Sequence, residues 1–172
     1  MSIDDLRSLA REFSTEAARC LGSRVYAIWL SGSLARGDFI ENVSDLDLEM
    51  ILKDGEKKRR KTDDMEELKD LTERTRTRAL ERGAREFDCF VFRLSDLKPK
   101  FHVLELVLLG ETMYGPAPKE VLSVDDMEKH AGELGMEFVR EAARNARDVL
   151  EGKTDYSIAS SVLSLIHISE PT

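Results

Sequence analysis

The sequence predicts a small α/β domain followed by a helical C-terminal segment. Three short stretches have the apolar or alternating pattern of β-strands, and one long amphipathic stretch lies between the second and the third. From residue 124 onwards the pattern is helical throughout. A helix, three strands around one long helix and then further helices are typical of a small α/β domain. We therefore expect this domain at residues 1–118 and a partial helical segment at residues 119–163.

The composition is that of a globular protein with one hydrophobic core. Hydrophobic residues make up 41% and charged residues 35% of the 172 positions, which disfavours a disordered chain. The net charge of -8 disfavours nucleic acid and anionic membranes as partners. No apolar run reaches the roughly 18 residues that span a membrane, and the two cysteines lack metal-ligand spacing. We expect a cytoplasmic protein.

The first predicted element is a helix that begins at Ser2 and ends at Gly22. Apolar residues recur along it at helical spacing, and acidic residues stand in its first turn, where the helix dipole favours them. Residues 25–30 are continuously apolar, which predicts a strand that is covered on both faces. Glycines at both ends of residues 32–37 predict a turn, and residues 44–52 alternate as a second strand does.

The remaining elements follow a polar, mostly basic loop at residues 56–61. A threonine N-cap with an acidic first turn predicts a helix that begins at residue 62 and ends at Gly83. Later patterns predict a strand, a short helix and a short edge strand, at residues 85–92, 101–109 and 113–116. The composition changes abruptly at residues 164–172, and we interpret them as a non-native tail.

The residues that best indicate chemistry follow the first predicted strand. Gly32 and Ser33 stand at its end, where a glycine turn presents backbone N–H groups to anionic oxygens such as those of phosphate. Asp45 and Asp47 are two residues apart on the second strand, so both carboxylates point to one face. Mg²⁺ prefers carboxylate oxygens together with the phosphates of a substrate. The pattern predicts a metal-dependent phosphate site.

A third carboxylate, Asp88, interrupts the apolar pattern of the third strand. Two metal ions ~3.5–4 Å apart can stabilise the attacking and the leaving oxygen at phosphorus, and a carboxylate from a neighbouring strand would complete their ligands. Asp88 could also accept the proton of an acceptor hydroxyl. Glu49 shares the face of Asp45 and Asp47, and an exposed position is favoured for it over a role in orienting a ligand.

Residues 32–37 (Gly-Ser-Leu-Ala-Arg-Gly) and 44–48 (Ser-Asp-Leu-Asp-Leu) together resemble the signature of a known superfamily. These are the nucleotidyltransferases that include DNA polymerase beta, in their minimal bacterial and archaeal form. The resemblance extends over residues 25–115 and includes Gly110 and the Tyr114-Gly115 pair. It implies a small mixed β-sheet flanked by helices.

The resemblance implies transfer of a nucleoside monophosphate, usually AMP from ATP, to a hydroxyl, with release of pyrophosphate. Carried over by position, Gly32 and Ser33 would hold the triphosphate. Arg36 either contacts a phosphate or braces the turn, and the sequence leaves both roles open. The ligands of the two Mg²⁺ ions would be Asp45, Asp47 and Asp88.

The sequence does not identify the acceptor, the molecule whose hydroxyl would receive the nucleoside monophosphate. A helical C-terminal segment favours a small molecule, as in the enzymes that adenylylate aminoglycoside antibiotics. One alternative is a partner protein, as for the minimal nucleotidyltransferase antitoxins that adenylylate a toxin. The other is an inactive nucleotide-binding module, which the presence of all three aspartates disfavours.

Overall fold

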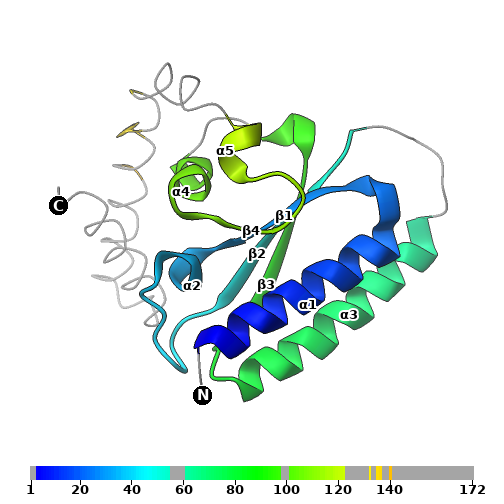
Figure 1. Cartoon of the computed structure of the whole chain (residues 1–172), viewed down its shortest axis with the longest axis horizontal. Coiled ribbons are helices and arrows are strands. Elements are labelled where there is room, and N and C mark those ends of the chain that lie inside the picture. Colours follow the sequence, from blue (N-terminus) through cyan, green and yellow to red (C-terminus); the bar gives the residue numbers. More distant parts are fainter. Residues whose placement is uncertain are drawn as a thin grey trace.

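The computed structural model describes residues 3–54, 61–97 and 101–122, together with residues 132, 135, 136 and 140. Helices and strands alternate along the three continuous ranges (Figure 1). The helices are α1 (Ile3–Leu21), α2 (Gly32–Arg36), α3 (Lys61–Glu81), α4 (Phe101–Leu109) and α5 (Pro118–Val121), with 3₁₀ turns η1 (Gly22–Arg24) and η2 (Leu94–Asp96). The strands are β1 (Val25–Ser31), β2 (Leu46–Leu52), β3 (Phe87–Arg93) and β4 (Glu111–Tyr114).

The strands form one mixed sheet in the order β3-β2-β1-β4. β1 runs antiparallel to β2 and β4, whereas β2 and β3 are parallel. A parallel pair needs a crossover connection, and α3 supplies it here. The predicted fold class is therefore confirmed. The register places Ser31 opposite Asp47 and Asp47 opposite Asp88, so these three residues lie side by side across the sheet.

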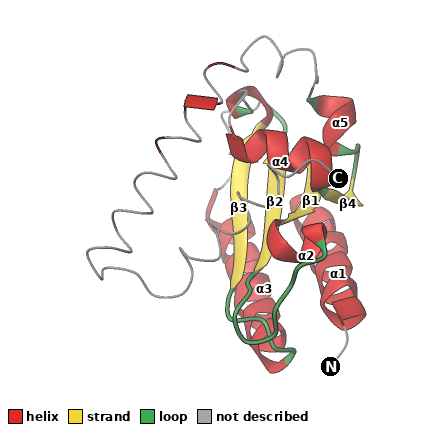
Figure 2. Ribbon diagram, turned by 90° about the vertical axis from the view of Figure 1, so that its left-hand side faces the viewer, coloured by secondary structure: helices red, strands yellow, loops and turns green. Residues whose placement is uncertain are grey.

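One face of the sheet packs against α1 and α3, which lie next to each other (Figures 1 and 2). Phe13 of α1 and Phe87 of β3 meet edge to face, with ring centroids 5.1 Å apart. Leu48 and Met50 of β2 are fully buried in the same core. Because side chains alternate along a strand, this core directs Asp47 and its same-face neighbours to the opposite side of the sheet.

The opposite face carries α4 and α5 (Figure 2). Trp29 of β1 is fully buried there, in a cluster that includes Leu106 of α4 and Leu122. The indole Nε1–H of Trp29 donates a hydrogen bond of 2.8 Å to the carbonyl oxygen of Pro116, which satisfies its one polar atom. The acidic residues of β2 therefore lie on the same side of the sheet as α4.

Two boundaries near the acidic residues differ from the prediction. The predicted turn at residues 32–37 is the short helix α2, which Gly37 closes with a φ of 86°. Leu34 of α2 is buried in the core that α1 forms with the sheet, and this packing favours a helix over an open turn. The second strand begins at Leu46, so Asp45 precedes it. The sequence did not predict α5.

The predicted helices after residue 124 and the tail at residues 164–172 lie outside the continuous ranges described above. The boundary at residue 118, between the predicted α/β domain and the predicted helical segment, therefore stays a prediction. Within the described residues, no helix combines the length and the apolar character that a membrane crossing requires.

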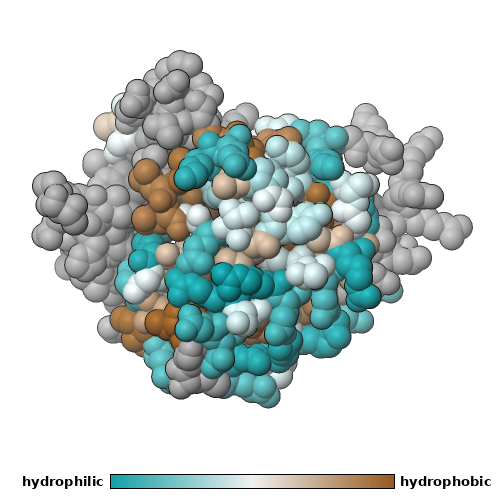
Figure 3. All heavy atoms as spheres, viewed as in Figure 1, coloured by the Kyte–Doolittle hydropathy of each residue, from teal (hydrophilic) through white to brown (hydrophobic). Residues whose placement is uncertain are grey.

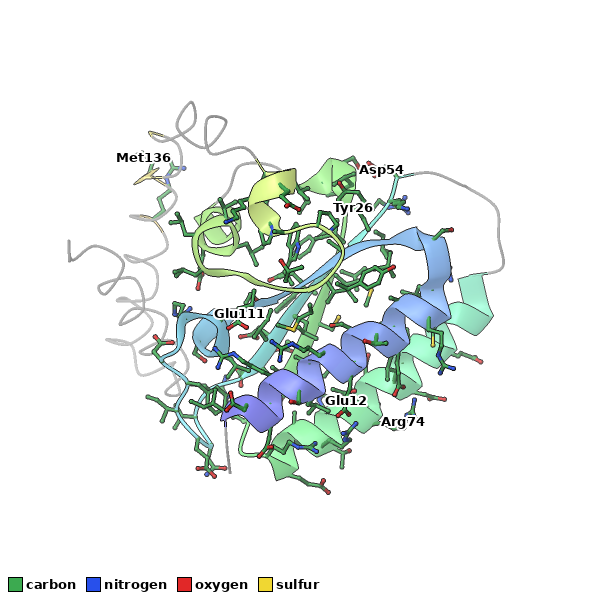
Figure 4. All side chains as sticks on the ribbon, in the orientation of Figure 1. Glu12, Tyr26, Asp54, Arg74, Glu111 and Met136 are labelled. Carbon is green, nitrogen blue, oxygen red and sulfur yellow. The ribbon has the colours of Figure 1, made fainter. Side chains whose placement is uncertain are left out.

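The outer surface of α1 and α3 is largely hydrophilic (Figure 3). Arg78 pairs with Glu12 at 2.5 Å and Arg74 with Glu16 at 3.5 Å, and these ion pairs connect the two helices. Figure 4 shows Glu12 and Arg74 on this side of the molecule. Exposed ion pairs contribute about 0–1 kcal/mol each. The buried core between the helices and the sheet therefore dominates the stability of this layer.

Candidate active site

The site is built around the junction of β1 and α2. Gly32 has a φ of 65°, a left-handed conformation that glycine adopts without steric cost. A Cβ atom at this position would lie 2.2 Å from Oδ2 of Asp47, so the close approach to this carboxylate requires glycine. The next residue, Ser33, is buried. Its carbonyl oxygen accepts hydrogen bonds from the N–H groups of Gly37 (3.0 Å) and Asp38 (3.1 Å).

Asp47 and Asp88 stand directly opposite each other on β2 and β3. Burial raises the pKa of Asp47 to about 7, with smaller contributions from the charges of Asp45 and Asp88. The pKa of Asp88 is raised as well, first by burial and then by the charges of Glu86 and Asp45. A carboxylate whose charge raises the pKa of another lies close enough to repel it. The charge of Asp45 acts on both Asp47 and Asp88, and that of Asp88 acts on Asp47, so the three aspartates singled out in the sequence lie near one another.

Asp45 lies just before β2, alongside the start of β3. The N–H of Arg85 donates to the carbonyl oxygen of Ser44 and the N–H of Leu46 to that of Glu86, both at 2.9 Å. The Arg85 side chain donates two hydrogen bonds to Asp45, from Nε to Oδ1 at 2.9 Å and from Nη2 to Oδ2 at 2.6 Å. No local pattern indicated this partner, because Arg85 is 40 positions away from Asp45 in the chain.

Arg36 connects α2 to α4. Its guanidinium donates to the Glu105 carboxylate of α4, and its Nε donates to Oδ2 of Asp38 at 3.3 Å. Only 14% of the Arg36 side chain is exposed. These two ion pairs are what bracing of the turn requires, and contact of Arg36 with a phosphate stays a prediction. Glu105 was not singled out in the sequence, since an acidic residue on a short apolar helix has no distinctive spacing.

Glu49 follows Asp47 on the same face of β2 and is only 8% exposed. The expectation of an exposed position is therefore wrong. The reason is tertiary, because α4 lies over this side of the sheet (Figure 2). Burial raises the pKa of Glu49 to about 8, and the charges of Asp47 and Glu105 contribute to this shift.

These residues offer oxygen donors, the kind that a hard cation such as Mg²⁺ prefers over softer metals. Besides burial, the charges of neighbouring acidic residues raise the pKa values of Asp47 and Asp88, and a bound cation would offset these charges. Among the described residues, no three acidic, histidine or cysteine side chains are already gathered as a metal site. The donor chemistry fits Mg²⁺, although the Asp45 side chain is directed at Arg85.

A model of the nucleotidyltransferase domain matches residues 7–105, which is more than half of the chain. The chain belongs to the nucleotidyltransferase domain family. This match confirms the resemblance seen in the sequence and the class of enzyme, a nucleotidyltransferase. The matched range contains the Gly32 turn and all three aspartates. No protein of curated function matches the sequence.

Several solved structures are similar at low identity. A chain from the crystal structure of a toxin–antitoxin with AMP-PNP is 15% identical, with 84% of this chain and 98% of that chain covered and a TM-score of 0.39. A chain from the tri-AMPylated Shewanella oneidensis HEPN toxin in complex with MNT antitoxin is 14% identical, with coverages of 86% and 99% and a TM-score of 0.36. A Sulfolobus solfataricus chain assigned to the nucleotidyltransferases is 24% identical, with coverages of 53% and 69% and a TM-score of 0.32. With such scores, membership of the family rests on the domain match.

Proposed function

We propose that this protein is a Mg²⁺-dependent nucleotidyltransferase that moves a nucleoside monophosphate, AMP from ATP, to a hydroxyl of a small molecule and releases pyrophosphate. The contact between Gly32 and the Asp47 carboxylate supports this proposal most directly. A triphosphate lying along the Gly32 backbone would bring its oxygens next to Asp47 and to Asp88 on the neighbouring strand. That placement is what metal-assisted transfer at phosphorus needs.

Each residue of the site has a proposed role. The backbone N–H groups of Gly32 and Ser33 would donate to the triphosphate. Bound Mg²⁺ would neutralise phosphate charge and stabilise the attacking and leaving oxygens. The residues that would hold it are Asp45, Asp47 and Asp88.

Asp88 is placed to act on the acceptor. It is only partly buried and lies on β3, a strand at the edge of the sheet, so an acceptor can approach it. The acceptor oxygen would form a bond to the α-phosphorus while the bond to pyrophosphate breaks. Asp88 would take the hydroxyl proton as a general base.

Arg36 is paired with Glu105 and Asp38, which favours a bracing role over direct binding of phosphate. The same arrangement would also serve a hydroxyl on a partner protein. The acceptor class is therefore the main target of the experiment that follows.

The test is incubation of the purified chain with Mg²⁺ and ATP labelled at the α-phosphate, together with a panel of aminoglycosides and, separately, cell proteins. We expect label to enter a small molecule and pyrophosphate to appear. ATP labelled at the γ-phosphate should leave the acceptor unlabelled, which distinguishes transfer of AMP from transfer of phosphate.

Asp45→Asn and Asp47→Asn should abolish the transfer and leave the thermal unfolding transition in place. Asp70→Asn, at an exposed position on α3, is the matched control and should retain full transfer. Label in a protein alone would replace the small-molecule acceptor by a protein acceptor. Transfer that persists in the Asp45→Asn/Asp47→Asn double variant would overturn the assignment of the metal ligands.

A further inference from the structure

Glu49 is a buried acid to which the proposed reaction assigns no role. Its Oε2 atom is fully buried and has no hydrogen-bond partner among the described residues. Its Oε1 atom accepts a single long hydrogen bond of 3.4 Å from the Ser31 hydroxyl. A buried polar atom without a partner destabilises the folded state, and more so when it is charged. Such a group calls for an explanation in terms of a missing partner.

The neighbours of Glu49 indicate the kind of partner that is missing. The charges that act on it belong to Asp47, two residues earlier on the same face of β2, and to Glu105 of α4. Both are acidic, and Glu105 is paired with Arg36, whose guanidinium also pairs with Asp38. A second carboxylate cannot donate a hydrogen bond to Glu49 while both are ionised. The surroundings therefore favour a positively charged group or a water polarised by one.

We propose that Glu49 is a fourth acidic residue of the metal site, whose unpartnered Oε2 accepts a hydrogen bond from a water on the Mg²⁺ ion held by Asp47. Mg²⁺ keeps several of its waters when it binds protein carboxylates. Residues that accept hydrogen bonds from the ligands of a metal orient those ligands and strengthen binding. The inference rests on the proposed function, because it requires a metal ion at Asp47.

If Glu49 acts through the metal ion, replacing it should have different effects with and without metal, which loss of a purely structural residue would not have. Glu49 should destabilise the metal-free protein, since its buried carboxyl has an unmatched oxygen. It should contribute to stability only when the metal is bound. Replacing Glu49 should therefore weaken metal binding without lowering the melting temperature of the metal-free protein.

The test measures Mn²⁺ binding to the full chain by titration calorimetry, together with the melting temperature in excess EDTA. Glu49→Gln keeps the shape of the side chain, and Glu49→Met removes its polar atoms at similar length. We expect both to weaken Mn²⁺ binding by about tenfold or more. We expect Glu49→Met to melt at the same or a higher temperature than the wild type in EDTA. Glu66→Gln, at an exposed position on α3, should change neither quantity.

Unchanged Mn²⁺ affinity in both Glu49 variants would overturn the inference, and so would a lower melting temperature in EDTA for both. Asp47→Asn separates this result from a failure of the proposed function. If the wild type and Asp47→Asn bind Mn²⁺ alike, the proposed metal site itself is wrong. If Asp47→Asn loses Mn²⁺ while both Glu49 variants keep it, only the role of Glu49 is wrong.

Discussion

Arg85 holds both carboxylate oxygens of Asp45, with Nε 2.9 Å from Oδ1 and Nη2 2.6 Å from Oδ2. Paired hydrogen bonds between a guanidinium and a carboxylate are among the stronger polar interactions in proteins. They also occupy the oxygens that a metal ion at Asp45 would need. Metal binding at Asp45 and the pairing with Arg85 should therefore compete.

Replacing Arg85 should strengthen metal binding in the absence of nucleotide. An ion pair that is partly exposed is worth up to about 1 kcal/mol, so we expect Arg85→Gln to tighten Mn²⁺ binding by roughly two- to fivefold. Titration calorimetry without nucleotide measures this change. Arg78→Gln removes a comparable pair with Glu12, between α1 and α3 on the other face of the sheet, and should leave the affinity as it is. Weaker binding in Arg85→Gln would show that Arg85 supports the metal site instead of competing with it.

Gly32→Ala should damage the site beyond its effect on the backbone. A left-handed conformation costs a non-glycine residue roughly 1–2 kcal/mol. The added methyl group would also meet Oδ2 of Asp47 at 2.2 Å. We expect a lower melting temperature and a loss of transfer of about 10²-fold, since small displacements of reacting groups have effects of this size.

Gly22→Ala is the matched control for Gly32→Ala. Gly22 has a φ of 59°, close to that of Gly32, but a Cβ atom there would meet nothing within 4 Å. It should therefore lose a similar amount of stability to backbone strain and keep its rate of nucleotide transfer. Equal transfer rates in the two variants would show that the close approach to Asp47 does not matter for the site.

The metal-free protein should lose stability as the pH rises through neutrality. The pKa of Asp47 is raised to about 7 from 3.8, and that of Glu49 to about 8 from 4.5. Between the usual pKa of each carboxyl and its raised pKa in the folded protein, the folded protein binds more protons than the unfolded chain. The free energy of unfolding therefore falls as the pH rises through this interval. Burial raises the pKa of Asp47 most, and the charges of Asp45, Asp88 and Glu105 add to this shift. Among the described residues, the charge of Arg36 lowers it.

Melting temperatures in EDTA from about pH 5 to about pH 9 measure this dependence. Asp47→Asn and Glu49→Gln should each flatten the decline, and excess Mg²⁺ should reduce it in the wild type. A wild-type melting temperature that rises across the same interval would contradict the raised pKa values.

Arg36→Gln should reduce stability more than it reduces nucleotide binding. The substitution leaves Glu105 as an unpaired, partly buried charge, which costs about 1–3 kcal/mol. The double variant Arg36→Gln/Glu105→Gln should recover part of this loss, because it removes the charge left behind. Urea unfolding and ATP titration measure the two effects separately. A large loss of ATP affinity at unchanged stability would instead identify Arg36 as a phosphate ligand.

Much of the fold follows from local patterns. The alternation along β2 correctly separated Leu48 and Met50, which are buried beneath α1 and α3, from Asp47 on the other face. The continuous apolar run of β1 correctly predicted a strand covered on both sides. The local pattern predicted a turn where the structure has the helix α2. Leu34 of this helix packs into the core beneath α1, and the local sequence does not show that contact.

The sequence by itself determined the family and the fold class, because these depend on patterns of residues at short spacings. The aspartates as metal ligands stay a prediction. Only the tertiary structure decided that Arg85 pairs with Asp45, that Glu105 pairs with Arg36, and that Glu49 is buried without a full set of partners among the described residues. These are contacts between segments distant in the chain, and they depend on which helix lies over which part of the sheet. Spacing along a sequence carries no information about such contacts, because packing of the whole fold brings the partners together.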